Sequence, residues 1–168
     1  MQLYNYNTDM KLKNFDHLNC SLAQTLSVIG EHWTLLIIRD VFFGLRRFDE
    51  FQKDLGIARN ILSNRLKRLV EEGIVEKSLG ESGFNEYRLT EKGLELQPIL
   101  LSMTHWGEKH KASPKGKRVI FVDRRDGKAI QTMNVRSHDG RKLKAKDIRG
   151  KKGPGYRSIA LDTPLSDD

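Results

Sequence analysis

The stretch from residue 48 to residue 75 constrains the fold most, because it places two short helical patterns on either side of a glycine. The first pattern, FDEFQKDL, ends at Gly56, a residue type that suits the left-handed position after a helix. The second begins near Ala58 and repeats apolar side chains at helical spacing. Two short helices joined by a turn of about four residues that contains glycine are typical of a helix-turn-helix.

The second of these helical patterns has a buried face and a polar face. At about 100° per residue, the apolar side chains cluster on one side; they are Leu62, Leu66, Leu69 and Val70. The opposite side carries amide and basic groups, with Ile61 and Ser63 at its edges; these groups are Asn60, Asn64, Lys67 and Arg68. Asparagine can pair with adenine, and lysine can reach guanine or phosphate, in a DNA major groove. An ordinary solvated face has a similar composition, so periodicity alone leaves both interpretations open.

Two further helical patterns precede this unit. The first covers about residues 19–29, where Ser21 with Gln24 matches a capping box, although Asn19 is an alternative cap. The second, HWTLLIIRDVFFG at residues 32–44, is apolar almost all round. A helix of that kind must be surrounded by other elements, which predicts that it lies at the centre of the core.

A hairpin pattern follows the glycine-flanked helices. Strand-like runs at residues 74–79 and 86–89 enclose a tip rich in glycine, serine and asparagine. A last helical pattern runs over about residues 91–111, and Pro98 is expected to bend it or to remove one of its hydrogen bonds. Helix, helix, short helix, turn, helix, hairpin and helix is the order of a winged helix-turn-helix.

The character of the chain changes at residue 113. Strand-like runs at residues 119–122 and 132–135 and two Asp-Gly turns predict a small β-meander. We therefore expect an α+β, mainly α, fold: a winged helix-turn-helix domain with a C-terminal β-rich extension. The expected parts are an N-terminal arm at 1–17, a DNA-binding and dimerisation domain at 18–112, and a basic extension at 113–168 with an acidic end.

The net charge of +8 is distributed unevenly. Residues 1–113 carry 15 basic and 15 acidic side chains, whereas residues 114–157 carry 15 basic and 4 acidic ones, and three aspartates follow. A basic excess of this kind favours a polyanionic partner. A solvated tail that only keeps the protein in solution is the alternative interpretation.

Several classes of protein are disfavoured by the sequence. No apolar run approaches the roughly 18 to 20 residues of a membrane span, and the N-terminus lacks a secretory signal, so we expect a cytoplasmic location. A single cysteine, Cys20, excludes an intramolecular disulfide. His105, Glu108 and His110 do not share one helical face, which disfavours a metal site. Without a catalytic or cofactor motif, we expect neither an enzyme nor a cofactor.

Three motifs in order resemble one family of regulators. RRFDEF, GIARNILSNRL and YRLTEKG stand within residues 18–112, and together they are similar to the HxlR-type branch of the MarR-like winged-helix transcriptional regulators. The resemblance implies a homodimer that uses the first and last helices of the domain. It also implies paired recognition helices on a pseudo-palindromic operator in double-stranded DNA. We expect a repressor rather than an activator.

The resemblance also implies which side chains contact DNA. The base-reading residues would be Asn60, Ser63, Asn64 and Lys67, and the phosphate contacts would be Arg47, Arg59, Arg68, Lys77 and Arg88. The sequence departs from the family at Ala58, a poor helix cap, and at the wing tip GESGFN, which lacks the frequent basic residue.

The sequence allows more than one interpretation of how the protein is regulated and what it binds. Some HxlR-type regulators use a cysteine at the place of Cys20 as a redox or electrophile sensor, and a helix N-terminus favours a thiolate; an inert, packed side chain is the alternative. Trp33, Phe42 and Trp106 are expected in the core rather than in a ligand cage, although an effector pocket between dimer helices stays open. The competing function is non-specific RNA or DNA binding, or a protein-interaction module.

Overall fold

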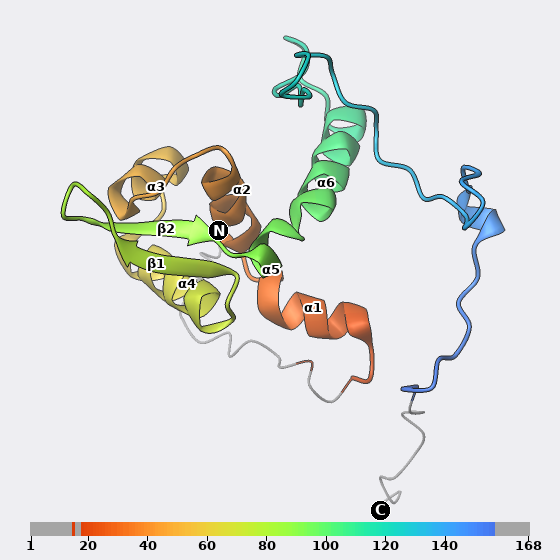
Figure 1. Ribbon diagram of the computed structural model, residues 1–168, viewed down its shortest axis with the longest axis horizontal. Helices are drawn as coiled ribbons and strands as arrows, with labels where there is room; N and C mark the ends of the chain where they lie inside the picture. The colour runs from red at the N-terminus through yellow and green to blue at the C-terminus, as the bar shows by residue number, and fades with distance from the viewer. Residues whose placement is uncertain (1–14, 16–17, 157–168) are drawn as a thin grey trace, which may run out of the picture.

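The computed structural model describes Phe15 and residues 18–156 of the 168-residue chain (Figure 1). The elements follow in the order α1 (Ser21–Ile29), α2 (Thr34–Phe42), α3 (Phe48–Leu55), α4 (Arg59–Glu71), β1 (Val75–Leu79), β2 (Asn85–Leu89), α5 (Glu91–Leu94) and α6 (Gln97–His110), with a 3-10 turn at Ala145–Asp147. The predicted, mainly helical winged helix-turn-helix is confirmed. Most of the expected N-terminal arm and the acidic end lie outside the described residues. No helix in the described part of the chain is long and apolar enough to cross a lipid bilayer.

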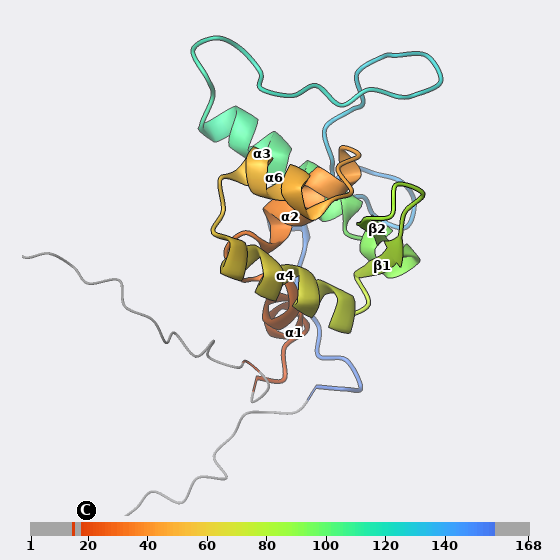
Figure 2. The same ribbon diagram turned by 90° about the vertical axis from the view of Figure 1, so that its left-hand side faces the viewer.

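Helix α2 lies at the centre of the core, as its sequence predicts. Ile37 and Ile38 have no exposed surface, and Val41 is 2% exposed. The surrounding elements contribute fully buried side chains from α3, α4 and β1, namely Phe51, Leu62, Leu66, Leu69 and Val75. Figure 2 shows α2 between α3 and α4. The leucines of α4 thus form the buried face that the helical spacing predicts.

The turn between α3 and α4 depends on Gly56. Its φ of 61° lies in the left-handed region, which a residue without a Cβ adopts at little cost, and its N–H donates to the Gln52 carbonyl at 3.0 Å. Ile57 is 3% exposed and anchors the turn in the core. Helix α4 then starts after Ala58, whose side chain provides no cap. The open N–H groups at this end are left free for another acceptor.

The wing is attached to the start of α3. Strands β1 and β2 pair antiparallel, with Lys77 opposite Tyr87. The Tyr87 N–H also donates to the Arg46 carbonyl at 2.8 Å, and Arg47 forms a bridge with Glu86. The buried Tyr87 ring meets the Phe51 ring edge-on with centroids 6.2 Å apart. The residues before α3 therefore act as a short third strand that positions the wing.

The segment after the wing differs from the prediction of one bent helix. It forms two helices, α5 and α6, and Pro98 lies in the first turn of α6, where a missing N–H costs nothing. The Thr90 hydroxyl caps α5 by accepting from the Gly93 N–H at 3.1 Å. Gly93 packs tightly, since a Cβ there would lie 2.2 Å from the Ile74 carbonyl oxygen. Proline thus begins a helix here rather than bending one.

Helix α1 begins differently from the prediction as well. Cys20 occupies the N-cap position and Ser21 is the first helical residue, with no side-chain cap. The predicted Ser21–Gln24 capping box is therefore wrong, and Asn19 does not cap the helix. The Asn19 amide instead donates to the Gly155 carbonyl at 3.0 Å, which brings the end of the extension next to α1.

The predicted β-meander is reduced to two turns. Within residues 113–156 the structure contains no strand, only isolated bridges between Val122 and Ala129 and between Arg136 and Lys142. The two Asp-Gly turns are present, with positive φ at both glycines. The apolar side chains of the predicted strands, including Val122 and Val135, are about half exposed. Without an apolar layer to pack on, short strands do not form a sheet, and the extension runs as an open arc (Figure 1).

A buried carboxylate fastens α4 to the turn between α1 and α2. Glu31 is 7% exposed in that turn. Arg68 donates to its Oε1 at 2.8 Å, and Arg65 forms an ion pair with its Oε2. Arg68 also donates to the Ser27 carbonyl. Burial, followed by the neighbouring charge of Arg68, lowers the pKa of Arg65 from its ordinary value.

Replacing Glu31 by Gln should destabilise the fold by about 2 to 3 kcal/mol, because two half-buried guanidinium groups lose their counter-charge. Urea unfolding measures the difference. Glu71→Gln is the matched control, since Glu71 lies 3.7 Å from Lys67 at the exposed surface, and should change the free energy of unfolding by less than about 0.5 kcal/mol. Equal losses in the two variants would contradict the role of Glu31.

Candidate nucleic-acid interface

The outer face of α4 presents unpaired polar groups. Asn60, Ser63 and Asn64 are exposed, and among residues 18–156 their side chains form no hydrogen bond. Lys67 is exposed and lies 3.7 Å from Glu71 one turn later. Figure 2 looks onto α4, with α3 above it and the wing beside it. Free amides on an uncovered helix are the groups that read base edges in a major groove.

Arg68 belongs to the clamp on Glu31 and not to this face. Arg68 is predicted as a phosphate contact, and its guanidinium instead donates to Glu31 and to the Ser27 carbonyl on the inner side of the domain. Arg65, which the sequence analysis did not single out, shares that role. Arg65 lies at an edge of the leucine stripe, where a long side chain can reach inward. Arg68 lies further round the helix, so its position along the helix provides no such signal.

A groove gathers three of the predicted residues from different elements. Its volume is about 340 Å³. Arg47 before α3, and Arg59 and Ser63 on α4, line it together with Asn85 of β2. The Arg59 guanidinium carbon lies 5.1 Å from the centroid of the Phe48 ring, which also lines the groove. We call this the N-terminal groove, because the first turns of α3 and α4 meet there.

The remaining basic candidates, Lys77 and Arg88, lie on opposite faces of the wing. Lys77 pairs with Tyr87 across the sheet, whereas Arg88 pairs with Glu76 on the opposite face. Arg88 and Glu76 line a different cavity, beside α6. The structure therefore does not bring Arg88 to the N-terminal groove. Asn85 is the residue that the sequence analysis missed, since only the register of the hairpin places it next to α4.

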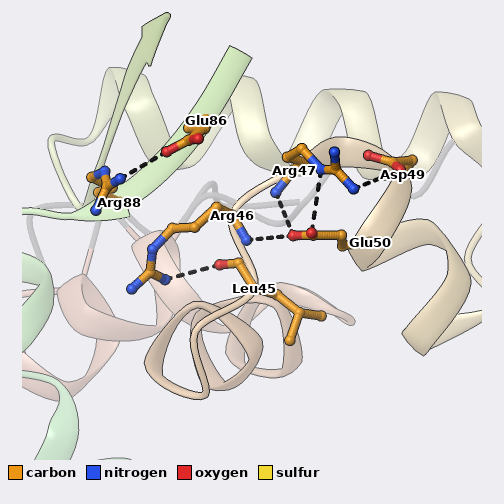
Figure 3. A network of polar contacts seen from close by, with 7 residues as sticks. All are labelled: Leu45, Arg46, Arg47, Asp49, Glu50, Glu86 and Arg88. Carbon is orange, nitrogen blue, oxygen red and sulfur yellow. Dashed lines mark hydrogen bonds and ion pairs between the residues drawn. The ribbon is translucent and has the colours of Figure 1, made fainter. Parts of the chain in front are cut away.

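A hydrogen-bond network orients the residues at the start of α3 (Figure 3). The Glu50 carboxylate accepts from the backbone N–H groups of Arg46 and Arg47 at 2.8 and 2.9 Å, and from Arg47 Nε at 3.2 Å. These backbone hydrogen bonds, with the charge of Arg47, lower the pKa of Glu50. Arg47 also lies 3.5 Å from Asp49, an exposed pair that a phosphate can replace.

Cys20 lies at the N-terminus of α1, as predicted. Its thiol is free and exposed, and it is far along the chain from the residues of the α4 face. The structure places it beside the apolar outer surface of α1, where Leu22 is 65% exposed. An exposed thiol at a helix start is chemically accessible, which an inert core cysteine is not.

The histidines near the end of α6 have separate partners. The His110 ring lies against Trp106 at a tilt of 37° with centroids 4.9 Å apart, and His105 meets the Phe121 ring edge-on. Trp106 is 61% exposed, so the expectation that it lies in the core is wrong. Glu108 pairs with Arg118 at 3.4 Å. In the part of the chain that the structure describes, no group of three His, Cys, Asp or Glu side chains gathers in a way that could hold a metal ion.

Comparison with protein families and relatives gives a consistent result. Residues 28–115 match the model of the family described as HxlR-like helix-turn-helix. A protein of Mycobacterium bovis named Uncharacterized HTH-type transcriptional regulator Mb3122 is 34% identical over 140 residues, which are 82% of this chain and 89% of that protein. Because 82% of this chain exceeds residues 1–112, that similarity includes part of the extension.

Two solved structures are similar in fold. The crystal structure of PA1607 is 45% identical with a TM-score of 0.75, and the match covers 80% of this chain and 95% of PA1607. The redox regulator HypR in its oxidized form is 35% identical with a TM-score of 0.51, over 54% of this chain and 97% of HypR. The first match includes part of the extension and the second is shorter.

The lowered pKa of Glu50 predicts a pH dependence of stability. A carboxylate whose folded pKa lies below its ordinary value of 4.5 stabilises the fold fully above that pH, and the contribution is lost as the pH falls through the lowered pKa. Glu50→Gln should cost about 1 kcal/mol at pH 7, after allowing for solvent screening, and the difference from wild type should shrink below pH 4.5. Urea unfolding measured at several pH values between about 3 and about 7 tests this prediction.

Asp49→Asn is the control for this measurement. Asp49 also lies in the first turn of α3, yet among the described residues its carboxylate accepts no backbone hydrogen bond. Its substitution should produce a smaller and flatter difference across the same pH range. A constant difference for Glu50→Gln at every pH would contradict the stabilising role of its ionised form.

Proposed function

The chain belongs to the HxlR-like helix-turn-helix family, and from this premise we propose that it is a sequence-specific DNA-binding transcriptional regulator that acts in the cytoplasm. The observation that carries the proposal is the uncovered face of α4. Its amides have no partner among the described residues, and the N-terminal groove beside it is lined by two arginines. Helix α4 serves as the recognition helix, with Asn60, Ser63, Asn64 and Lys67 against base edges.

The phosphate contacts follow from the placement of the basic side chains. Arg47 and Arg59 line the N-terminal groove, and Lys77 is exposed on the wing. They flank α4 on two sides, as groups that position a recognition helix do. Arg88 lies beyond the wing and would reach only a phosphate further along the duplex. Arg68 pairs with Glu31 and is therefore left out of the proposed DNA contacts.

The protein acts as a homodimer. Helices α1 and α6 carry large apolar side chains that nothing in the described part of the chain covers, including Leu22 at 65% and Trp106 at 61% exposed. Leu26, Ile99 and Met103 extend the same surfaces. Apolar helix faces of this size mark an interface with another protein molecule. A two-fold dimer presents two α4 helices to a pseudo-palindromic operator, and binding there represses transcription.

Cys20 is the candidate for a response to oxidants. HypR, the similar structure described as a redox regulator, supports this proposal, and the thiol of Cys20 is exposed at the start of α1 beside the proposed dimer surface. Peroxide treatment should release the operator from the wild-type protein and not from Cys20→Ser. Release from both proteins would remove Cys20 from the proposal.

The charge of the extension favours a second candidate, non-specific binding of polyanions. Residues 114–157 hold 15 basic and 4 acidic side chains, and most of this segment is exposed. Footprinting at physiological salt with random DNA as competitor distinguishes the two functions. Protection of two half-sites about one helical turn apart supports the regulator, whereas uniform protection that salt abolishes supports the alternative.

Asn64→Ala should cost about 1 to 3 kcal/mol at one base pair of the operator and relax the preference for that base. Affinities for the operator and for its single-base variants measure this. Glu71→Ala, at the far end of the same helix, should leave the pattern of base preferences unchanged. Uniform weakening of Asn64→Ala on every sequence would assign Asn64 to the DNA backbone.

Neutralising the extension should reduce the salt dependence of DNA binding. Replacing Lys142, Lys144 and Lys146 by Gln is expected to reduce the slope of log affinity against log salt by up to about 3, since each phosphate contact contributes about 0.9. The matched control replaces Lys92, Lys109 and Lys111 of the winged domain. An unchanged slope in the first variant would show that these three lysines of the extension do not contact DNA.

A further inference from the structure

The end of the wing carries two large apolar side chains in solvent. Leu79, the last residue of β1, is 73% exposed, and Phe84, directly before β2, is 64% exposed. The described part of the chain therefore leaves most of both side chains uncovered. We call these two residues the apolar wing tip. Two uncovered apolar groups at the end of one hairpin suggest a surface that meets another molecule.

The apolar wing tip lies on the side of the wing that faces the N-terminal groove. Leu79 pairs with Asn85 in the hairpin, so the two side chains share one face, and Asn85 lines the groove. Phe84 lines the same groove. The other face of the wing carries the ion pair of Glu86 with Arg88 at 2.8 Å. The apolar wing tip thus continues the surface that the first turn of α4 presents.

The turn of the hairpin holds the apolar wing tip in place. The Gly80 N–H donates to the Phe84 carbonyl at 2.8 Å, and the Gly83 N–H donates to the Gly80 carbonyl at 3.0 Å. Gly83 has a φ of 77°, which suits a residue without a Cβ. At its root the wing is tied to the start of α3 through the Tyr87 N–H. A hairpin held at both ends can keep an apolar side chain in position against a duplex.

The end of the wing offers no charge that attracts phosphate. Residues 80–85 include no lysine or arginine, and Glu81 adds a negative charge. Basic groups stand behind the tip instead: Lys77 lies on the same face as Leu79, and Arg47 lines the groove. These groups can contact the sugar-phosphate backbone. What the tip itself offers to a duplex is apolar surface.

The length of the wing fits the distance to a neighbouring minor groove. Strand β1 leaves the core at Val75, which is 1% exposed, and Leu79 lies about 13 Å further along the strand. Figure 1 shows the turn of the hairpin extending past the helices. Adjacent major and minor grooves are half a helical turn apart, which is about 17 Å. A wing beside a recognition helix can therefore reach the next minor groove with its tip.

We propose that Leu79 and Phe84 form an apolar wedge that enters the minor groove beside the half-site read by α4 and bends the duplex there. Apolar side chains that enter this groove partly unstack a base step and bend DNA toward the major groove. Pyrimidine–purine steps such as TA deform most easily, so the operator is also selected at a step that α4 does not contact. This inference rests on the proposed function, because it requires α4 in the adjacent major groove.

The test uses the full-length protein and the footprinted operator, labelled at both ends for fluorescence energy transfer. Wild type should bend this DNA, and Phe84→Ala should reduce the bend angle by about half or more. Operators with TA or AA at the flanking step are then compared, since A-tracts are stiff. Wild type should prefer TA about tenfold, and Phe84→Ala less than about threefold. Circular dichroism confirms that the variant is folded.

Glu81→Gln is the matched control in the same turn. Removal of this charge should strengthen binding to all sequences alike, and the bend and the step preference should not change. Phe84→Arg creates a basic tip of the opposite chemistry. It should steepen the slope of log affinity against log salt by about 0.9, because it adds a phosphate contact, and it should lose the bend.

The bend and the footprint can fail separately. An operator that wild type and Phe84→Ala bend equally, or that wild type does not bend, overturns the wedge and leaves the proposed function standing. A protein without a footprint fails the proposed function, and the wedge fails with it. An equal loss of affinity for TA and AA operators in Phe84→Ala overturns the wedge and makes Phe84 a plain contact. An unchanged bend with lost regulation in cells overturns it in favour of a protein partner at the tip.

Discussion

The pairing of one buried carboxylate with two arginines determines how α4, the proposed recognition helix, sits in this domain. Glu31 is taken almost completely out of water, so it requires counter-charges, and Arg65 and Arg68 of α4 provide them from one edge of that helix. The leucines of α4 fix its depth in the core, but a stripe of leucines permits rotation and sliding. The two guanidinium groups remove that freedom. Trp33, with φ of 77°, starts α2 directly after the clamp and stores strain there.

Pairing of acidic groups inside the fold also explains how a domain with no net charge can present a basic surface. Glu31 and Glu50 turn their carboxylates inward, onto guanidinium and backbone N–H groups. Asp40 is 1% exposed and pairs with Arg39 at 2.5 Å, and burial raises the pKa of its carboxyl. These acids are therefore occupied within the fold. Equal numbers of acidic and basic residues still leave Arg59, at the start of α4, and Lys77, on the wing, facing solvent.

The extension adds packing contacts and charge to the winged domain and forms no second hydrophobic core among the described residues. Its first turn packs Phe121 against the Phe43 and His105 rings, and its end reaches α1 through the hydrogen bond from Asn19 to Gly155. Between these two contacts the chain is exposed, which leaves its basic side chains available. The winged domain thus holds α4 in place, whereas the extension carries all of the net positive charge.

Short-range sequence patterns correctly predicted the elements that depend only on neighbouring residues. Leu62, Leu66 and Leu69 are buried as their spacing requires, and Gly56 is left-handed as its place after α3 requires. Predictions failed where the expected hydrogen bond does not form or where the expected element has nothing to pack on. Ser21 matched a capping box that does not form, and the strands expected in the extension lacked an apolar layer to pack on. Pro98 was placed correctly but begins a helix instead of bending one.

The sequence by itself determined the order of helices and hairpin, the buried stripe of α4 and the family, because each depends on spacing within about twenty residues. Only the tertiary structure decided which charges are free. Arg59 and Arg68 are both arginines of α4. Arg68 pairs with Glu31, 37 residues earlier in the chain, whereas Arg59 remains exposed. The tertiary fold also brought Arg46, Arg88 and Arg124 around one cavity. The energy of a charge depends on what surrounds it in space, and spacing along the chain does not contain that information.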